Sequence, residues 1–236
     1  MNRGRATAAR PRYGTLCGVE LIERLLRIDV SALSDADKAL PVVDAAVGAM
    51  IPDVRMAGPA FTVVAEDDHL PVMSALAEAA PGDVLVIAAA AGPYAVFGEL
   101  FATEARRRGL AGIVADGHCR DLCGLRRIGL PVFARGTTPR SGTALSRATL
   151  GATVVCGGVD VSPGDIVFGD DDGVLIAPAE RVASALDTAE SIARSERAIL
   201  AAQGRGEGLH GLTNHDEHVA ALDRGEPSAL AFRVDA

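Results

Sequence analysis

Apolar positions along the chain follow either a helical or a strand-like period, and the changes of period mark out the expected elements. Helices are expected within 15–30 and at 70–80, 99–108 and 179–203. Strands are expected at 61–65, 84–87, 110–115, 131–134, 152–156, 166–168 and 174–177. The runs at 84–87 and 110–115 are continuously apolar, which is typical of strands covered on both faces. With βα units in the middle and strands later, this order predicts one compact α/β domain with two terminal extensions.

Local breaks in the pattern refine the expected boundaries. The segment Ser34–Asp37 has the composition of a helix start. Ala57-Gly58-Pro59 contains two residues that interrupt regular structure, so a break is expected there. Gly109 follows a helix that ends in three arginines, as expected for a glycine just beyond a helix C-terminus. From Gly204 onward the periodicity is weak, which indicates a loose extension.

Composition excludes several classes of function. The chain has 236 residues and a formal net charge of −8, which disfavours general attraction to nucleic acid. Lys38 is the only lysine among 23 basic residues, so Schiff-base chemistry, pyridoxal phosphate attachment and a P-loop lysine have almost no candidate. With six Phe, two Tyr and no Trp, small aliphatic residues must build the core.

Cysteine spacing and the N-terminal sequence provide evidence on the cellular compartment of the protein. No CxxC pair occurs among the four cysteines, which we interpret as reduced and mostly buried thiols: Cys17, Cys119, Cys123 and Cys156. The N-terminus is basic and no apolar segment follows it at once, which is unlike a secretory signal. No apolar run reaches the roughly 18 residues that a membrane span needs. We therefore expect a soluble, cytoplasmic protein.

Three short motifs resemble functional sites, but each has a simpler structural explanation. The G-x-G-x-x-G match at 206–211 follows no strand, so it does not indicate a dinucleotide site. Asp170-Asp171-Asp172 has the oxygen ligands of a cation site, but a β-turn between two strands explains it more simply. His215 and His218, with His210 nearby, have a spacing that suits metal ligands on a helix, while the composition favours a solvated polar tail.

The segment from Gly98 to Asp121 carries the strongest chemical signal. Glu99 opens a predicted helix, and Arg120-Asp121 follows a predicted buried strand. Sites in α/β folds form beyond the carboxyl ends of strands, so these residues would face one crevice if the strands are neighbours. Arg120 can hold a carboxylate, and the two acids can bind Mg²⁺ or Mn²⁺. An Arg120–Asp121 surface pair and an ordinary N-terminal Glu explain the spacing equally well.

Four stretches, taken in order, resemble the RraA-like family: PGDVLVIAAAAG (81–92), FGELFATEARRRGLAGIVADGHCRD (97–121), LPVFARGTTPR (130–140) and GGVDVSPGDIVFGDDDGVLIAP (157–178). The family contains the regulator of ribonuclease activity A and divalent-metal 4-hydroxy-4-methyl-2-oxoglutarate aldolases that also decarboxylate oxaloacetate. The resemblance implies a single-domain swivelling β/β/α-type fold, an αββα sandwich, at 20–205. Residues 1–19 and 206–236 would then be a basic N-terminal and a C-terminal extension.

The resemblance also implies an activity and an assembly. The activity is that of a metal-dependent carbon–carbon lyase acting on 4-hydroxy-2-oxo acids, with Mg²⁺ or Mn²⁺ as cofactor. The assembly is a homotrimer, sometimes doubled to a hexamer, with active sites at the subunit interfaces and no nucleic-acid or membrane partner. A non-catalytic regulator on the same scaffold, or a lyase of altered specificity, remains an alternative.

Site residues follow position by position from the resemblance. Asp121 would bind the metal directly, and Glu99 would hold metal-bound water. Arg120 would bind the carboxylate of the pyruvyl group, helped by the main-chain N–H groups of Leu100 and Phe101. On helix position alone, Glu196 matches an acid that a neighbouring subunit contributes.

One departure from the family pattern concerns substrate choice. The aldolase pattern R-D-x-x-E/D has its last acid replaced by Gly124. His118, also unusual, is either a substrate contact or proton donor, or a loop histidine without a role. Asp44 lies where the family often has an acid, and no firm role is assigned to it. The fold and the metal site are expected to survive this departure, but the standard substrate does not follow.

Overall fold

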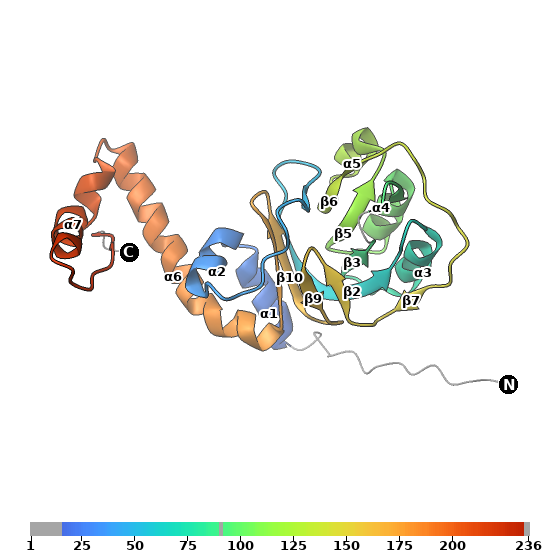
Figure 1. Ribbon diagram of the computed structural model, residues 1–236, viewed down its shortest axis with the longest axis horizontal. Helices are drawn as coiled ribbons and strands as arrows, with labels where there is room; N and C mark the ends of the chain where they lie inside the picture. Colours follow the sequence, from blue (N-terminus) through green and yellow to red (C-terminus); the bar gives the residue numbers. More distant parts are fainter. Residues whose placement is uncertain (1–15, 90–91, 234–236) are drawn as a thin grey trace.

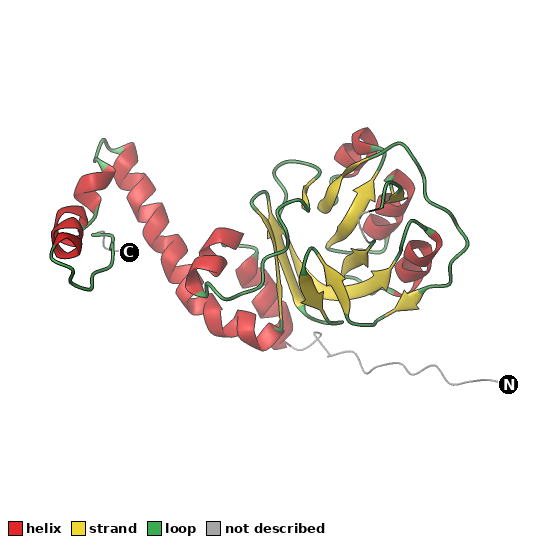
Figure 2. Ribbon diagram, viewed as in Figure 1, coloured by secondary structure: helices red, strands yellow, loops and turns green. Residues whose placement is uncertain are grey.

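The computed structural model describes residues 16–89 and 92–233 and has a mixed α/β architecture (Figures 1 and 2). The helices are α1 (Leu16–Leu25), α2 (Val30–Ala36), α3 (Leu70–Glu78), α4 (Glu99–Arg107), α5 (Leu122–Ile128), α6 (Ala179–Gly204), the 3₁₀ helix η1 (Leu209–Leu212) and α7 (His215–Asp223). The strands are β1 (Gly48–Ala49), β2 (Met56–Val64), β3 (Val84–Ala88), β4 (Ala95–Phe97), β5 (Gly112–Cys119), β6 (Val132–Thr137), β7 (Thr149–Leu150), β8 (Val154–Cys156), β9 (Val159–Val161), β10 (Ile166–Asp170) and β11 (Gly173–Ala177). The α/β fold that the sequence predicts is confirmed.

The main sheet organises the two apolar cores. Its strand order is β1-β6-β5-β3-β2-β10-β11, with β4 added beside β5 and β7 beside β2. Neighbours from β2 through β3 and β5 to β6 are parallel, whereas β10 and β11 are antiparallel. One core lies between the parallel strands, α3 and α4, and the other joins β10 and β11 to α1, α2 and α6. Figure 1 shows these two helix groups on opposite sides of the sheet.

Strand β2 runs through the predicted break at Ala57-Gly58-Pro59, so that prediction is wrong. Gly58 and Pro59 pair with Val167 and Ile166 of β10. A Cβ at Gly58 would lie 2.3 Å from the carbonyl oxygen of Gly82, so the glycine permits a close backbone approach. The interruption that these residues suggest in isolation is overridden by their sheet pairing.

Helix α2 likewise differs from the local prediction, because Ser34–Ala36 end a helix instead of starting one. The helix begins at Val30, whose buried N–H donates to Asp170 Oδ2 at 2.9 Å. It ends where the N–H of Asp37 donates to the carbonyl of Leu33. A carboxylate at the far end of β10 therefore caps this helix.

Strand β5 extends beyond its predicted end at residue 115 and continues to Cys119. The extension is held from both sides, because His118 pairs with Gly136 of β6 and with Ala95 of β4. As a result Arg120 and Asp121 follow directly on the carboxyl end of a central strand.

The buried thiols are unreactive in this fold. Burial raises the pKa of Cys119 to about 11 and the pKa of Cys156 to about 12. Both are therefore protonated at neutral pH, and neither forms a disulfide, whereas Cys123 is exposed.

The C-terminal segment is folded, in contrast to the loose extension that we expected. After α6 it forms η1 and α7, and a small apolar cluster joins Leu212 to Ile199 and Ala202 of α6. Residues 1–15 of the predicted N-terminal extension lie outside the described residues, while α1 crosses the predicted boundary at residue 19. The division of the chain at 20–205 stays a prediction. Within the described part of the chain, no helix combines the length and apolar character needed to cross a membrane.

Candidate functional site

Glu99 and Asp121 meet at one corner of the sheet, beyond β4 and β5. Together with Arg120 they form what we call the Asp121 corner. The backbone N–H of Glu99 donates to Asp121 Oδ2 at 3.3 Å. Arg120 Nε lies 3.4 Å from the same oxygen. The side chains of Arg120 and Asp121 are 39% and 42% exposed, so a solute can reach both. The structure thus brings the side chains of Arg120 and Asp121 to the backbone of Glu99, so the three residues that the sequence singled out are neighbours.

Gly98 makes this close approach possible. A Cβ on Gly98 would lie 2.5 Å from Asp121 Oδ2 and 2.7 Å from Arg120 Cγ. Contacts of that length do not occur, so any side chain at this position displaces Arg120 and Asp121. The sequence shows Gly98 only as a helix boundary, and its role in the site is visible only in the structure.

The Glu99 side chain covers Gly124. A Cβ on Gly124 would lie 2.3 Å from Glu99 Cδ and 2.4 Å from Glu99 Oε2. The other carboxylate oxygen, Oε1, accepts a hydrogen bond from Arg127 Nη2 at 3.0 Å. Glu99 therefore fills the space that an acid at position 124 would enter. Arg127, which no motif in the sequence singles out, holds Glu99 in that position.

Leu100 and Phe101 occupy the first turn of α4, directly after Glu99. N–H groups in the first turn of a helix have no acceptor within the helix, and the positive end of the helix dipole adds to their attraction for anions. The Leu100 side chain is exposed, whereas Phe101 is half-buried and packs near the ring of His69. The proposed anion-binding role of the two N–H groups stays a prediction.

His118 lies on β5, two residues before Arg120, and is half-buried. Its Nδ1 is 2.9 Å from the carbonyl oxygen of Gly92. Because a carbonyl only accepts, Nδ1 carries a proton in this contact. His118 thus holds the segment before β4 in place, and its predicted contact with substrate is untested.

Glu196 lies apart from the other predicted site residues. It is on α6, which packs against α1 and α2 on the side of the sheet opposite to α4 and α5 (Figure 1). Within one chain this residue therefore does not join the Asp121 corner. Its predicted contribution to a neighbouring subunit's site remains a prediction.

An ion network joins β5 and β6 to the segment before β1. Arg135 of β6 pairs with Asp116 of β5 and, at 3.3 Å, with Asp44. Asp116 Oδ2 also accepts the N–H of Gly157 at 2.8 Å. The N–H of Ala46, followed by Arg135, lowers the pKa of Asp44. Asp44 thus has a structural role that links three segments, and nothing in its local sequence indicates this partner.

The donors at the Asp121 corner suit a hard divalent cation. Both contacts of Asp121 described above fall on Oδ2, and Glu99 is anchored through Oε1. Mg²⁺ and Mn²⁺ prefer carboxylate oxygens and water, and commonly use only one or two protein carboxylates. Glu99 and Asp121 are 41% and 42% exposed, which leaves room for water and substrate beside them.

Comparison with known proteins identifies the family of this chain. A family model described as RraA-like, Aldolase/RraA, matches residues 30–176. A Halalkalibacterium halodurans protein with the provisional name 4-hydroxy-4-methyl-2-oxoglutarate aldolase is 35% identical over 162 residues, covering 68% of this chain and 77% of its own.

Solved structures support the same assignment. A Pseudomonas syringae protein is similar with a TM-score of 0.73 and 25% identity, over 82% of this chain and 96% of its own. An unusual member of the RNase ES inhibitor RraA family from Streptomyces coelicolor has a TM-score of 0.67 and 29% identity, over 75% and 94%. The match to the family model, the curated relative and these folds show that this chain belongs to the RraA-like family.

Proposed function

We propose that the protein is a divalent-metal-dependent lyase that cleaves 4-hydroxy-2-oxo acids to release pyruvate and also decarboxylates oxaloacetate. The observation that carries the proposal is the convergence of Glu99, Arg120 and Asp121 at one accessible corner. The provisional name of the Halalkalibacterium relative supports the same reaction class.

Each residue has a distinct task in this reaction. Asp121 holds the metal, and Arg120 binds and orients the substrate carboxylate through its guanidinium. The N–H groups of Leu100 and Phe101 add two donors for the same anion. A bound Mg²⁺ or Mn²⁺ supplies Lewis acidity, which polarises the keto group and stabilises the negative charge left after C–C cleavage.

Acidic side chains at the Asp121 corner carry out the proton transfer. Glu99, held by Arg127, positions a water that exchanges protons with the substrate. Glu196 of the partner subunit would face the same water in a homotrimer or a doubled hexamer. Lys38 is exposed on the loop after α2, where it pairs with Asp35, so it offers no Schiff-base alternative at this corner.

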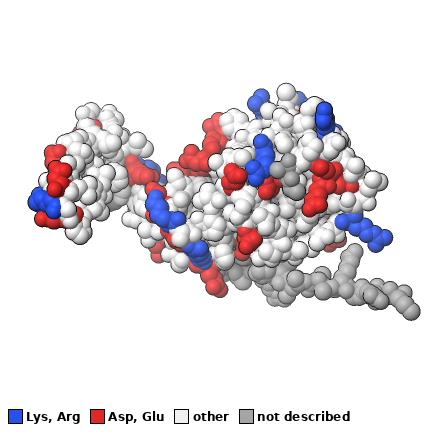
Figure 3. All heavy atoms as spheres, viewed as in Figure 1, with Lys and Arg blue, Asp and Glu red and all other residues white. Residues whose placement is uncertain are grey.

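The proposed partners are a small 2-oxo acid and other copies of the chain, in the cytoplasm. Acidic and basic side chains are interspersed on the face drawn in Figure 3, where the described residues form no broad basic patch. A nucleic-acid backbone needs such a patch for its phosphate contacts. Together with the formal net charge of −8, the charge distribution on this face leads us to propose no nucleic-acid or membrane partner.

Removal of the metal tests the activity directly. Treatment with a chelator is expected to abolish pyruvate release from oxaloacetate, and added Mn²⁺ or Mg²⁺ to restore it, because the reaction needs a cation as electron sink. Pyruvate is measured by a coupled assay, with the uncatalysed metal-only rate subtracted. Equal rates with and without the chelator, above that background, would contradict the proposal.

A non-catalytic regulator is the second candidate, favoured by the likeness to the Streptomyces member of an RNase inhibitor family. The two functions make opposite predictions in the same assay. A regulator shows no pyruvate release above background at any metal concentration.

Restoring the family acid is expected to harm activity. Gly124→Glu drives Glu99 away from Arg127, because both side chains need the same space. We expect kcat/KM for oxaloacetate to fall by about tenfold, part of the roughly 10²–10⁴-fold that a positioned acid–base group contributes. Glu99→Ala gives the loss expected when this acid is absent, and the loss in Gly124→Glu should approach it because the displaced acid no longer holds its water. Higher activity in Gly124→Glu than in the wild type would refute the competition for space.

A further inference from the structure

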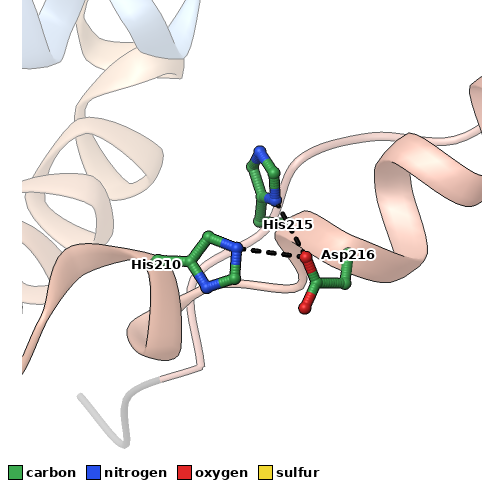
Figure 4. A group of neighbouring side chains, drawn as sticks. All are labelled: His210, His215 and Asp216. Atoms are coloured by element: carbon green, nitrogen blue, oxygen red, sulfur yellow. Dashed lines mark hydrogen bonds and ion pairs between the residues drawn. The ribbon is translucent and has the colours of Figure 1, made fainter.

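Two histidines and an aspartate converge in the C-terminal segment, far from the Asp121 corner (Figures 1 and 4). Asp216 Oδ1 lies 3.0 Å from His210 Nε2 and 3.2 Å from His215 Nδ1. The ring centroids of the two histidines are 4.5 Å apart, and one ligand atom from each residue lies within 4.8 Å of the others. All three side chains are exposed. The function proposed above uses none of them.

The spacing of these atoms suits a tetrahedral metal. Zn²⁺ binds imidazole nitrogen and carboxylate oxygen at about 2.0–2.2 Å, so neighbouring ligand atoms around it lie roughly 3.3–3.5 Å apart. Asp216 Oδ1 is already near that distance from both imidazoles. A metal at this position would replace the protons that these imidazole nitrogens share with the carboxylate, because a bound ion needs neutral imidazoles and an ionised Asp216.

The turn that carries these three side chains is held by hydrogen bonds in which the side chains themselves take no part. The buried hydroxyl of Thr213 donates to the carbonyl of His210 at 3.0 Å and accepts the N–H of His215 at 3.3 Å. Asn214 accepts the N–H of Ala231 through Oδ1 and donates to the carbonyl of Ala229 at 3.0 Å. The backbone of η1 and the start of α7 are therefore held in register before any ion binds.

We propose that His210, His215 and Asp216 form a Zn²⁺ site with one open coordination position, which fastens η1 to α7. Two imidazoles and one carboxylate are a donor set for zinc-like metals, unlike the all-oxygen set at Asp121. The apolar cluster that joins this segment to α6 is small, with Ile199, Ala202 and Leu212 as its buried members. A metal cross-link supplies the stability that such a small core lacks.

His218 provides a matched control. Its spacing from His215 in the sequence suits a metal pair, but in the structure its Nδ1 lies 2.9 Å from Ser228 Oγ. It is therefore a histidine on the same helix that the site does not use.

The test is a zinc titration of the tag-free, metal-stripped full chain in an Asp121→Ala background, which removes the other proposed metal ligand. We expect about one Zn²⁺ per chain, with affinity at least about tenfold weaker in His210→Ala and in His215→Ala. His218→Ala should bind as the parent does. Circular dichroism of each metal-free variant checks that the fold is intact.

Co²⁺ substitution gives a second readout that needs no site variant. The parent should develop the intense visible bands of low-coordinate Co²⁺ with nitrogen and oxygen ligands. Two results overturn the proposal: six-coordinate, water-like Co²⁺ bands in the parent, or unchanged zinc affinity when both His210 and His215 are replaced. Neither result bears on the lyase, which depends on Asp121.

Discussion

Asp121→Asn is expected to lower metal-dependent pyruvate release by about 10³-fold or more, because it removes the direct ligand of a cation that contributes several kcal/mol to catalysis. The amide keeps the shape of the side chain and an oxygen that can accept the N–H of Glu99. Since the side chain is 42% exposed, the melting temperature should change little.

The measurement is kcat/KM for oxaloacetate over a range of Mn²⁺ concentrations, with the melting temperature recorded alongside. Asp172→Asn is the matched control, because it neutralises an exposed carboxylate in the turn between β10 and β11. Near-wild-type turnover by Asp121→Asn at saturating Mn²⁺ would show that the catalytic metal is held elsewhere.

Gly98→Ala is expected to reduce kcat/KM by about 10²-fold, the effect of moving reacting groups by roughly an ångström. The added methyl would lie 2.5 Å from Asp121 Oδ2, so Asp121 and Arg120 must shift. The cost in stability should be small, since the contacts are with movable, half-exposed side chains. Gly98 itself has an extended backbone, with φ −162° and ψ −154°, which alanine also adopts.

Gly204→Ala is the control for a glycine-to-alanine change outside the site. Gly204 ends α6, and a Cβ there meets no atom within 4 Å. Activity and melting temperature are measured for both variants. If Gly98→Ala keeps full activity, the packing of Arg120 and Asp121 against Gly98 does not matter for the reaction. If Gly98→Ala unfolds the protein, the contacts at Gly98 support the fold more than the site.

The sequence alone was sufficient where the relevant interactions are local. Helices α3, α4 and α6 and strand β3 lie where their apolar periods predict them, since a repeat of 3.6 or a continuous apolar run is visible within one segment. The corner that joins Glu99 to Arg120 and Asp121 was predictable on the condition that the preceding strands are neighbours, which the pairing of β3 and β4 with β5 supplies. It follows from the rule that the carboxyl ends of neighbouring parallel strands share one edge of a sheet. The ordered motifs indicated the family.

Tertiary structure decided the features that depend on contacts between distant segments. Helix α2 starts at Val30 because Asp170, 140 residues away, caps it, and β2 continues through Gly58 and Pro59 because β10 pairs with them. Only packing shows that Glu99 fills the space above Gly124 and that Gly98 makes room for Asp121. A period or a motif describes neighbours along the chain, whereas these features depend on which atoms occupy the same space.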